Sequence, residues 1–409
     1  MESSRRNYLV VTGGYWAFSV TDGAIRMLVV LYFHLLGYSP FEVAMLFLFY
    51  EFFGIVTNLV GGWLGARIGL NLTMQIGMAM QVIALTMLTV PDAWLSVAYV
   101  MAAQALSGIA KDLNKMSAKA SIKTLVPEQG RDSTLFKWIA VLTGSKNALK
   151  GVGFFLGGAL LQGVGFRGAL VVLSVTLLMV LLLMIMLLPQ QLGIAKSKPK
   201  FTQVFSKSPA INWLSAARFF LFGSRDVWFV VGLPVFLYSV LGWSFTQVGG
   251  FLALWIIGYG IVQASAPKMI RCSHHGSGPD GATAQFWAFI LVLLPAAMAL
   301  ALMRDIDPES VLVIGLIAFG AVFAINSAVH SYLVVAWSDR DKVSMNVGFY
   351  YMANAGGRLV GTVLSGWAYQ TQGLIGCLWW SAGFVLLSAL LAMKLPRAPS
   401  IEVQHDRAM

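Results

Sequence analysis

The chain has 409 residues, of which 58% are apolar and only 11% are charged, and its mean hydropathy is +0.76. Because soluble domains carry roughly 25% charged residues, this composition excludes a water-soluble globule. The 12% of aromatic residues and the lack of low-complexity tracts exclude a disordered chain. The formal net charge of +11 raises the question of a nucleic-acid partner, which the distribution of the charges answers.

Apolar stretches long enough to cross a bilayer follow one another along the whole chain. Arg5 and Arg6 precede the first stretch, and since no cleavage site of small residues follows, we predict a retained helix and no signal peptide. The predicted spans are residues 8–36, 41–63, 72–90, 94–113, 136–162, 168–188, 213–241, 245–269, 286–303, 311–335, 345–369 and 374–395. The sequence therefore predicts an all-α integral membrane protein with twelve transmembrane helices.

The longest polar interruption separates six predicted spans from the other six. It is rich in lysine and contains two prolines, which is typical of a linker. We predict an N-terminal six-helix bundle at residues 1–194, a cytoplasmic linker at 195–212, a C-terminal six-helix bundle at 213–396 and a cytoplasmic tail at 397–409.

Lysine and arginine are distributed unevenly between the two sides of the predicted membrane. Twenty lie in loops and flanks on the side of the N-terminus, whereas two, Arg167 and Arg304, lie on the other side. Cytoplasmic loops carry such an excess, so both termini are predicted to be cytoplasmic, and the basic charge requires no nucleic acid. After the fourth span four lysines recur at every fourth position, and there we predict a helix that extends past the membrane with a basic stripe facing headgroups or the next loop: Lys111, Lys115, Lys119 and Lys123.

Two stretches of the first half recur in the second half. The residues LGYS at 36–39 are answered 205 positions later by LGWS at 241–244. Five positions recur at a separation of 208: Lys150, Gly153, Gly158, Gln162 and Gly165 correspond to Arg358, Gly361, Gly366, Gln370 and Gly373. Parallel six-helix repeats with a substrate site at the midplane are the arrangement of the major facilitator superfamily, so we predict that fold.

The loop after the second span, GWLGARIG at residues 62–69, resembles the cytoplasmic motif G-x-L-G-D-R-x-G of that superfamily. The resemblance implies that Gly62, Gly65 and Gly69 allow close helix approach and that Arg67 pairs across a gate. Ala66 stands where Asp is usual, which puts this ionic latch in doubt. The alternative is a tight glycine-rich turn with one arginine that only sets the topology.

Nine Lys, Arg, Asp and Glu residues lie away from the ends of the predicted spans, and each would cost about 2.5 to 3.5 kcal/mol if it faced lipid. The cations are Arg26, Lys146, Lys150, Arg218, Arg225 and Arg358, and the acids are Asp22, Glu51 and Asp226. Asp22 and Arg26 are four residues apart and share a helix face, which allows them to pair. Arg225 and Asp226 point about 100° apart and are expected to have different partners.

The excess of cations over acids predicts a site for an anion. We expect Lys150 and Arg358 to be equivalent cations on the two halves, assisted by Arg26, Lys146 and Arg225. Lysine serves as a point charge for phosphate, and arginine makes planar bidentate contacts to oxyanions. The alternative, which the sequence leaves open, is that the acids neutralise three of the cations in salt bridges between helices.

Several other residues enter the prediction with smaller roles. Asn147 is a candidate hydrogen-bond donor to the anion, although it serves equally well in helix packing. Arg218 lies near a cytoplasmic helix end and is expected to reach the interface. The sequence has no phosphate-binding loop or dinucleotide fingerprint, so transport would be secondary. The candidate proton carriers are Asp22, Glu51 and Asp226.

Cysteine and histidine give weak signals. Cys272 and Cys377 form no framework for a disulfide or a zinc site. His34 and His330 are possible proton sites, but histidines at such positions more often serve packing. We therefore expect no metal and no cofactor, and since no nucleophile has an evident base, we expect no enzyme.

Long runs of the sequence resemble the ArsJ-type organoarsenical efflux permeases. The runs are NYLVVTG at residues 7–13, YWAF at 15–18, TDGAIRM at 21–27, YEFFG at 50–54, AQALSGIAKDL at 103–113 and LTGSKNALKG at 142–151. The likeness is dense in the first half and thinner in the second, where it includes NAGGR at 354–358.

The resemblance implies export of 1-arseno-3-phosphoglycerate, which a partner glyceraldehyde-3-phosphate dehydrogenase makes from arsenate. It also implies a multi-pass protein of the bacterial inner membrane, and we expect a monomer. The charge of a substrate with a phosphate and an arsenate group agrees with the cation excess. Uptake or exchange of an ordinary organophosphate such as phosphoglycerate is the alternative, and a membrane-embedded enzyme or a receptor is a remote one.

Overall fold

The computed structural model describes residues 2–37, 46–126, 131–188, 206, 208–243, 245–270, 278–339 and 342–397, and its secondary structure over these residues is entirely helical. By their contacts the residues form two compact units. Unit 1 comprises residues 1–127, 145–205 and 340–352, and unit 2 comprises 128–144, 206–339 and 353–409. Most of the predicted linker and tail lies outside the described residues.

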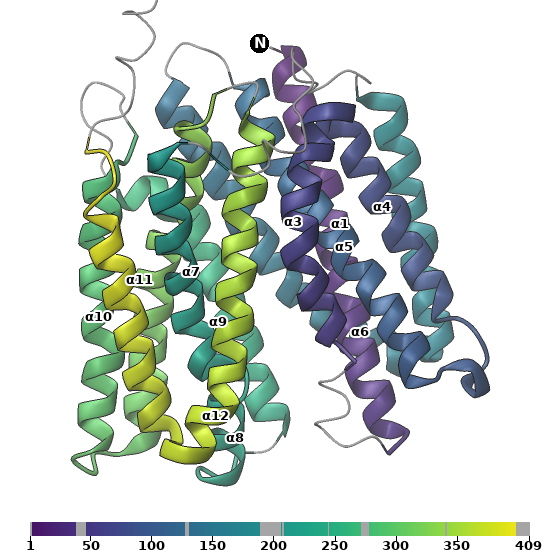
Figure 1. Ribbon diagram of the computed structural model, residues 1–409. Coiled ribbons are helices and arrows are strands. Elements are labelled where there is room, and N and C mark those ends of the chain that lie inside the picture. The colour runs from purple at the N-terminus through teal and green to yellow at the C-terminus, as the bar shows by residue number, and fades with distance from the viewer. Residues whose placement is uncertain are drawn as a thin grey trace, which may run out of the picture. The chain divides into compact units, whose positions relative to one another are not determined.

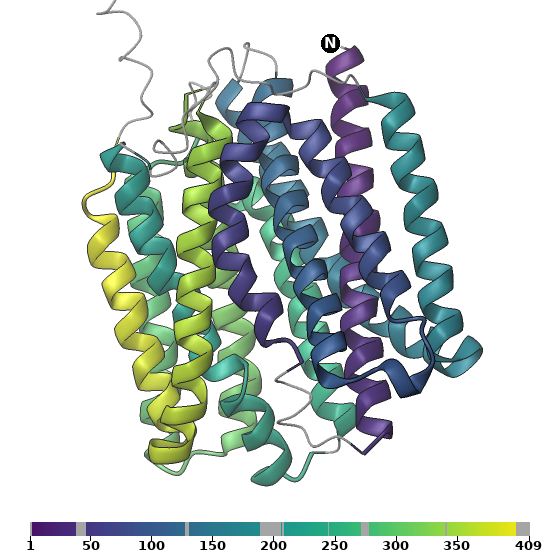
Figure 2. The same cartoon turned by 45° about the vertical axis from the view of Figure 1, so that its right-hand side comes forward.

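Unit 1 is assembled around one central helix, α5. Helices α1, α3 and α4 all contact α5, and the side-by-side course of α3, α4 and α5 is visible in Figures 1 and 2. Ser96 caps α5, because its hydroxyl accepts from the N–H of Tyr99. The elements are α1 (Glu2–Leu35), α3 (Leu48–Ile68), α4 (Leu70–Met87), the short 3-10 helix η1 (Asp92–Trp94), α5 (Val97–Leu125), residues 145–187 of α6 (Arg131–Leu187) and the start of α12 (Val343–Ala392).

Unit 2 contains the first turns of α6, the rest of α12 and five further helices. These are α7 (Pro209–Phe229), α8 (Gly232–Ser239), α9 (Phe245–Met269), α10 (Gly281–Leu302) and α11 (Pro308–Ala336). Asp280 begins α10 with a capping box, and the side chain of Asp307 caps α11 through the N–H of Ser310. Aromatic side chains fill the core, where Trp228 meets Trp255 and Phe319 edge to face.

The seventh predicted span, residues 213–241, is divided into α7 and α8. Pro234 has no N–H to donate to the preceding turn, so a continuous helix would lose a bond at this point. Ser365 of α12 compensates at the start of α8, where its hydroxyl accepts from the N–H groups of Val231 and Gly232, both at 3.2 Å. Pro234 therefore causes the break, and Ser365 accepts hydrogen bonds from N–H groups at the start of α8.

Two very long helices each contain a glycine break at the place where the sequence predicts a loop. Helix α6 has 57 residues and α12 has 50, which at about 1.5 Å per residue is more than twice the bilayer core of about 30 Å. Gly165 has a φ of 73° and Gly373 a φ of 66°, a region that glycine occupies without strain. The two arms of α12 meet at the bottom of Figure 1.

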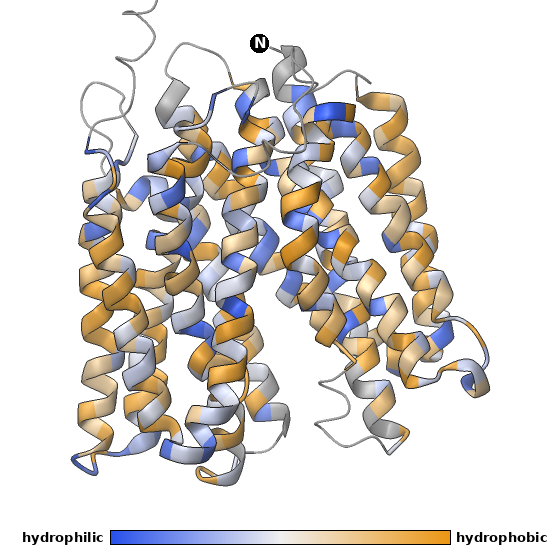
Figure 3. Ribbon diagram, in the orientation of Figure 1, coloured by the Kyte–Doolittle hydropathy of each residue, from blue (hydrophilic) through white to orange (hydrophobic). Residues whose placement is uncertain are grey.

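The outer surface of the helices is apolar. Met186 is 81% exposed and Ile314 is 69% exposed, and orange, apolar residues cover most of the helix lengths in Figure 3. Among the described residues, six helices are long and apolar enough to cross a membrane, and α6 and α12 are two of them. An all-helical chain with apolar side chains directed outward is suited to lipid, and the predicted fold class is confirmed.

Candidate functional site

Asp22, in the central part of α1, forms a buried ion pair in unit 1. Its Oδ2 accepts from Nζ of Lys150 on α6 at 2.7 Å, and its Oδ1 accepts from the hydroxyl of Tyr50 on α3 at 2.5 Å. Because both oxygens have partners, the carboxylate can remain ionised in a medium of low dielectric. One side chain thereby joins three helices.

Glycines bring α1 and α6 close enough for this pair to form. A Cβ on Gly23 would lie 2.4 Å from the carbonyl oxygen of Lys150, and a Cβ on Gly153 would lie 2.4 Å from that of Val20. Real Cβ atoms do not approach backbone oxygens so closely, so only glycine fits at either position. The helices meet backbone to backbone, which places Asp22 within reach of Lys150.

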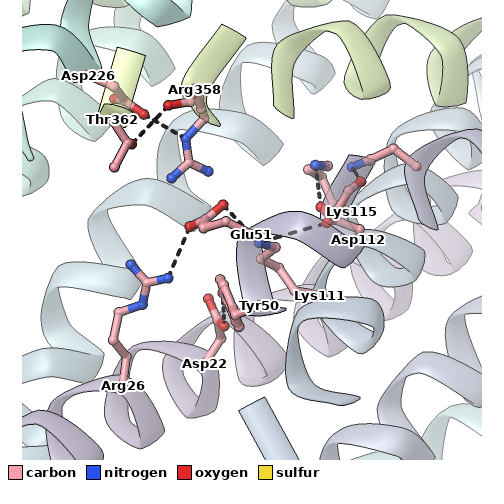
Figure 4. Close-up of polar contacts among 12 residues, drawn as sticks. Asp22, Arg26, Tyr50, Glu51, Lys111, Asp112, Lys115, Asp226, Arg358 and Thr362 are labelled. Atoms are coloured by element: carbon pink, nitrogen blue, oxygen red, sulfur yellow. Dashed lines mark hydrogen bonds and ion pairs between the residues drawn. The ribbon is translucent and has the colours of Figure 1, made fainter. Parts of the chain in front are cut away.

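Glu51 on α3 holds a second pair in unit 1. It lies 3.1 Å from Nη2 of Arg26 and 3.9 Å from Nζ of Lys111 (Figure 4). Both cations contact the ring of Tyr50, with centroid distances of 4.6 Å for the guanidinium and 3.8 Å for the ammonium. The spacing of Asp22 and Arg26 allowed these two to pair, but Arg26 pairs with Glu51 on another helix.

The basic stripe of α5 lies inside unit 1, and the prediction that it faces headgroups is wrong. Lys119 is 2% exposed, and its Nζ donates to the hydroxyl of Tyr351 on α12 at 2.6 Å. The ammonium of Lys115 lies 4.2 Å from the centre of the same ring and 2.5 Å from Oδ1 of Asp112. The helix does extend to Leu125, but Tyr351 and Asp112 provide partners that the local pattern does not reveal.

The remaining predicted contacts of unit 1 lie one turn from Lys150 on α6. Lys146 and Asn147 are half-buried, and Lys146 interacts electrostatically with Lys150, Lys115 and Asp22. Cations outnumber acids in this group, which we call the unit 1 cluster: Arg26, Lys111, Lys115, Lys146 and Lys150 against Asp22, Glu51 and Asp112.

In unit 2 one buried carboxylate is shared by two arginines, and we call these three residues the unit 2 cluster. Oδ2 of Asp226 on α7 accepts from Nε of Arg358 on α12 at 3.0 Å (Figure 4). Its Oδ1 accepts from Nε of Arg225 at 2.7 Å. The prediction that Arg225 and Asp226 have different partners is wrong, because the long arginine side chain folds back onto its neighbour. Two cations for one acid again leave an excess of positive charge.

The pairs of the two units repeat one arrangement. The corresponding residues are Asp22 and Asp226, 204 positions apart, and Lys150 and Arg358, 208 positions apart. The close helix approach is repeated as well, since a Cβ on Gly361 of α12 would lie 2.6 Å from the carbonyl oxygen of Gly223 on α7. These parallels support the duplication that the sequence indicates.

The residues predicted as a gate loop lie at the junction of α3 and α4. Gly69 ends α3 with a φ of 99°, and Arg67 stacks on Trp63 of its own helix at 5.2 Å. A Cβ on Gly62 would lie 2.8 Å from the carbonyl oxygen of Ser344 in the first turn of α12, and the hydroxyl of Ser344 donates to the carbonyl of Gly62 at 2.7 Å. Pairing of Arg67 across a gate stays a prediction.

Other predictions concern isolated residues. Arg218 is 2% exposed and donates through Nε to Oδ1 of Asn354 at 2.9 Å, so the prediction that it reaches the interface is wrong. Cys272 and the side chain of His34 lie outside the described residues. Over the part of the chain that is described, no group of His, Cys, Asp and Glu side chains could hold a metal ion.

Sequence reasoning missed three members of the network in unit 1. Tyr50 adjoins Glu51 inside the run at residues 50–54, and Asp112 lies three residues before Lys115 in an apolar segment. The signal for Asp112 was present, since an acid and a base three residues apart on a helix commonly pair, whereas the position of Tyr50 beside Glu51 gave none. Tyr351, by contrast, had no local signal because its partners are more than 230 positions away.

A chain of apolar-coated helices that carries buried, paired charges has the character of a polytopic membrane transport protein. The sequence matches the family model of the Major Facilitator Superfamily over residues 11–306. The chain belongs to the Major Facilitator Superfamily, a family of transporters and not of enzymes.

Solved structures of this superfamily share the fold. The human organic anion transporter MFSD10 (TETRAN) is 16% identical, with a TM-score of 0.75 over 95% of this chain and 99% of that one. The proton:xylose symporter XylE is 14% identical, with a TM-score of 0.74 over 96% of both chains, and the transporter FucP in its outward conformation is 12% identical, with a TM-score of 0.73 over 96% and 99%. A comparison with curated protein sequences found no match.

Proposed function

We propose that this chain is a secondary active transporter that exports the anion 1-arseno-3-phosphoglycerate by alternating access and thereby confers arsenate resistance. The observation that carries the proposal is the excess of cations over carboxylates in both clusters, at positions shielded from lipid. The runs that resemble ArsJ-type permeases include much of this machinery, since Asp22 lies in residues 21–27, Glu51 in 50–54 and Lys150 in 142–151.

In this proposal the cations bind the two anionic groups of the substrate. The residues are Arg26, Lys146, Lys150, Arg225 and Arg358, with Asn147 as a hydrogen-bond donor. Arginine suits the planar face of an oxyanion, whereas lysine acts as a point charge. A doubly anionic substrate offsets the positive excess of the clusters better than a sugar does, and the solved relative named for organic anions belongs to the same fold.

The carboxylates give the site a means of coupling. Asp22, Glu51 and Asp226 are the proposed proton carriers, since each accepts from cations that we assign to the substrate. When a proton neutralises such a carboxylate, its basic partners are released to bind an anion, and when the carboxylate ionises it binds them again. Protonation and anion binding are therefore linked at the same side chains.

The proposal includes a setting and a partner. The chain would lie in the bacterial inner membrane as a monomer with both termini cytoplasmic, and glyceraldehyde-3-phosphate dehydrogenase would supply the organoarsenical. Everted membrane vesicles test this directly when they receive the dehydrogenase, arsenate and the cosubstrates. We expect arsenic to accumulate only while the dehydrogenase reaction runs. Accumulation of labelled phosphoglycerate without arsenic uptake would instead support an ordinary organophosphate transporter.

The assignment of the cations predicts the effect of removing them. Lys150→Ala or Arg358→Ala should abolish the arsenate resistance that the chain confers together with the dehydrogenase, at unchanged membrane expression. Lys137→Ala is the matched control, because Lys137 lies on the same helix as Lys150 but is exposed. Full resistance in both Lys150→Ala and Arg358→Ala would reject the anion site.

A further inference from the structure

A buried polar face of α11 in unit 2 carries side chains for which the described residues supply no partner. Asn326 and His330 are four residues apart and therefore share a helix face. Both are 0% exposed, and neither the amide atoms of Asn326 nor the ring nitrogens of His330 form a hydrogen bond with the described part of the chain. Because buried polar atoms are nearly always bonded, these four atoms call for a partner from outside the described residues, such as a small ligand or water.

A buried cation lies against this face. Nη1 of Arg218 on α7 donates to the hydroxyl of Ser327 at 3.1 Å, and Ser327 adjoins Asn326 on α11. The amide of Gln263 on α9 donates to the same hydroxyl at 3.1 Å. Arg218 is the charged group that acts electrostatically on His330. A fixed positive charge is thus held at α11 by the residue that follows Asn326.

The chemistry of these groups selects the ligand. A metal ion or another cation would be repelled by the guanidinium of Arg218, and an apolar ligand would leave the amide of Asn326 and the imidazole of His330 without bonds. An oxyanion can accept from the amide N–H of Asn326 and from an imidazole N–H of His330, and the field of the cation attracts it. A water molecule could bond to the neutral groups as well, but it has no net charge that would balance the guanidinium of Arg218.

This place is distinct from the unit 2 cluster. Arg218 precedes Arg225 by seven residues, which is about 10.5 Å along α7. The ring of Phe222 lies next to both guanidinium groups, with centroid distances of 3.7 Å to Arg218 and 5.1 Å to Arg225. The aromatic ring therefore divides two positively charged places on one helix.

We propose that Arg218, Asn326 and His330 form a binding site for a small oxyanion inside unit 2, separate from the cations assigned to the transported substrate. The ligand is either a free inorganic oxyanion or the phosphate end of an organic molecule, which share the same recognition chemistry. The site does not depend on the organoarsenical function, because any transporter of this fold with these residues would hold it.

The test is equilibrium binding of radiolabelled inorganic phosphate to the purified full chain in a Lys150→Ala/Arg358→Ala background, which removes the equivalent substrate cations of both units. We expect one saturable site. Asn326→Asp should weaken binding at least tenfold, because a carboxylate then competes for the cation. His330→Gln, which retains an N–H donor, should stay within threefold. The matched control is Gln81→Glu, a buried amide of unit 1 that also lacks a bonded partner among the described residues, and it should bind phosphate normally.

Competition separates the two sources of the oxyanion. If 3-phosphoglycerate displaces the label as well as arsenate does, the site accepts the end of an organic phosphate, and if only arsenate displaces it, the site takes a free ion. Absence of saturable binding, or unchanged binding in Asn326→Asp, would overturn the proposal. Should that variant fail to fold, a crystal structure with selenate decides, since an anomalous peak must lie within hydrogen-bond distance of Asn326 and His330. Failure of export in vesicles would leave this result unaffected.

Discussion

Asp226 accepts from Arg225 on one oxygen and from Arg358 on the other, so a single carboxylate holds two cations. Removing its charge would deprive two partly buried guanidinium groups of the carboxylate that they share. Breaking a buried pair in this way typically costs about 3 to 5 kcal/mol. An exposed pair of the same length behaves differently, because solvent replaces the lost partner.

The chain contains a matched set for this comparison. Asp226→Asn is expected to lower the midpoint of thermal unfolding strongly, whereas Asp92→Asn is expected to change stability by about 1 kcal/mol or less. Asp92 pairs with Arg167 at 3.0 Å with both side chains half exposed, and Asp226 pairs with Arg358 at the same distance but is buried. Thermal unfolding in detergent measures both. Added phosphoglycerate should restore part of the loss in Asp226→Asn, and equal midpoints for the two variants would contradict the argument.

The sequence was sufficient to predict which charged residues belong to the clusters, but not which of them form ion pairs with each other. The cost of a charge in lipid identified Lys150 and Arg358 from the sequence alone. The partner of Arg26, however, depends on how α1 and α3 pack, and helical spacing offered only Asp22. Tertiary distance decided in favour of Glu51.

At the level of the helices, glycine residues set how closely two helices approach each other. Gly153 on α6 touches the backbone of α1, whereas Gly163 on the same helix has no atom within 4 Å of an added Cβ. The two positions share a helix and differ in their surroundings. Substituting alanine at each of the two positions therefore distinguishes an effect on helix packing from an effect on helix propensity.

Gly153→Ala is expected to separate α1 from α6, lower the unfolding midpoint and reduce transport, because the added Cβ would meet the carbonyl oxygen of Val20. Gly163→Ala should leave transport unchanged and stabilise the helix by up to about 1 kcal/mol, the difference in intrinsic propensity. Thermal unfolding and vesicle uptake are measured side by side. A stable, active Gly153→Ala protein would show that the helices do not need this approach.

Helix boundaries were predictable where glycine and apolar length act together, as at Gly165 and Gly373. They were not predictable where a distant residue decides, as at the break before α8, which Ser365 caps. The stripe on α5 shows the same limit, because regular spacing identifies one helix face but not what covers it. Lys119 is covered by Tyr351 and not by headgroups.

For the whole molecule, the cation excess in both clusters indicates a charged substrate, so the membrane potential affects the free energy of transport. A net charge that crosses a membrane gains or loses about 2.3 kcal/mol for each 100 mV. Export of an anion from a cell with a negative interior is therefore favoured by about 2.3 kcal/mol per 100 mV for each negative charge, before any proton moves. The membrane potential is accordingly the first driving force to test.

In everted vesicles with a positive interior, collapse of the potential with potassium and valinomycin is expected to reduce accumulation of the organoarsenical. When nigericin collapses the pH gradient and the potential is kept, accumulation of the organoarsenical should fall only if Asp22, Glu51 or Asp226 carries a proton in each cycle. Initial rates and final levels of arsenic are measured under each condition. If accumulation is the same with and without the membrane potential, transport is electroneutral.

The lysines of α5 carry one more consequence. Successive ammonium groups at positions 111, 115, 119 and 123 are attached about 6 Å apart along the axis, which is shorter than the Debye length of about 8 Å at physiological salt. Because Lys119 and Lys123 are buried, water and salt screen them less than exposed charges, so the fields of neighbouring lysines overlap along α5. If one of these lysines is replaced by a neutral residue, the interval between the remaining charges becomes about 12 Å, and their fields overlap less at that point.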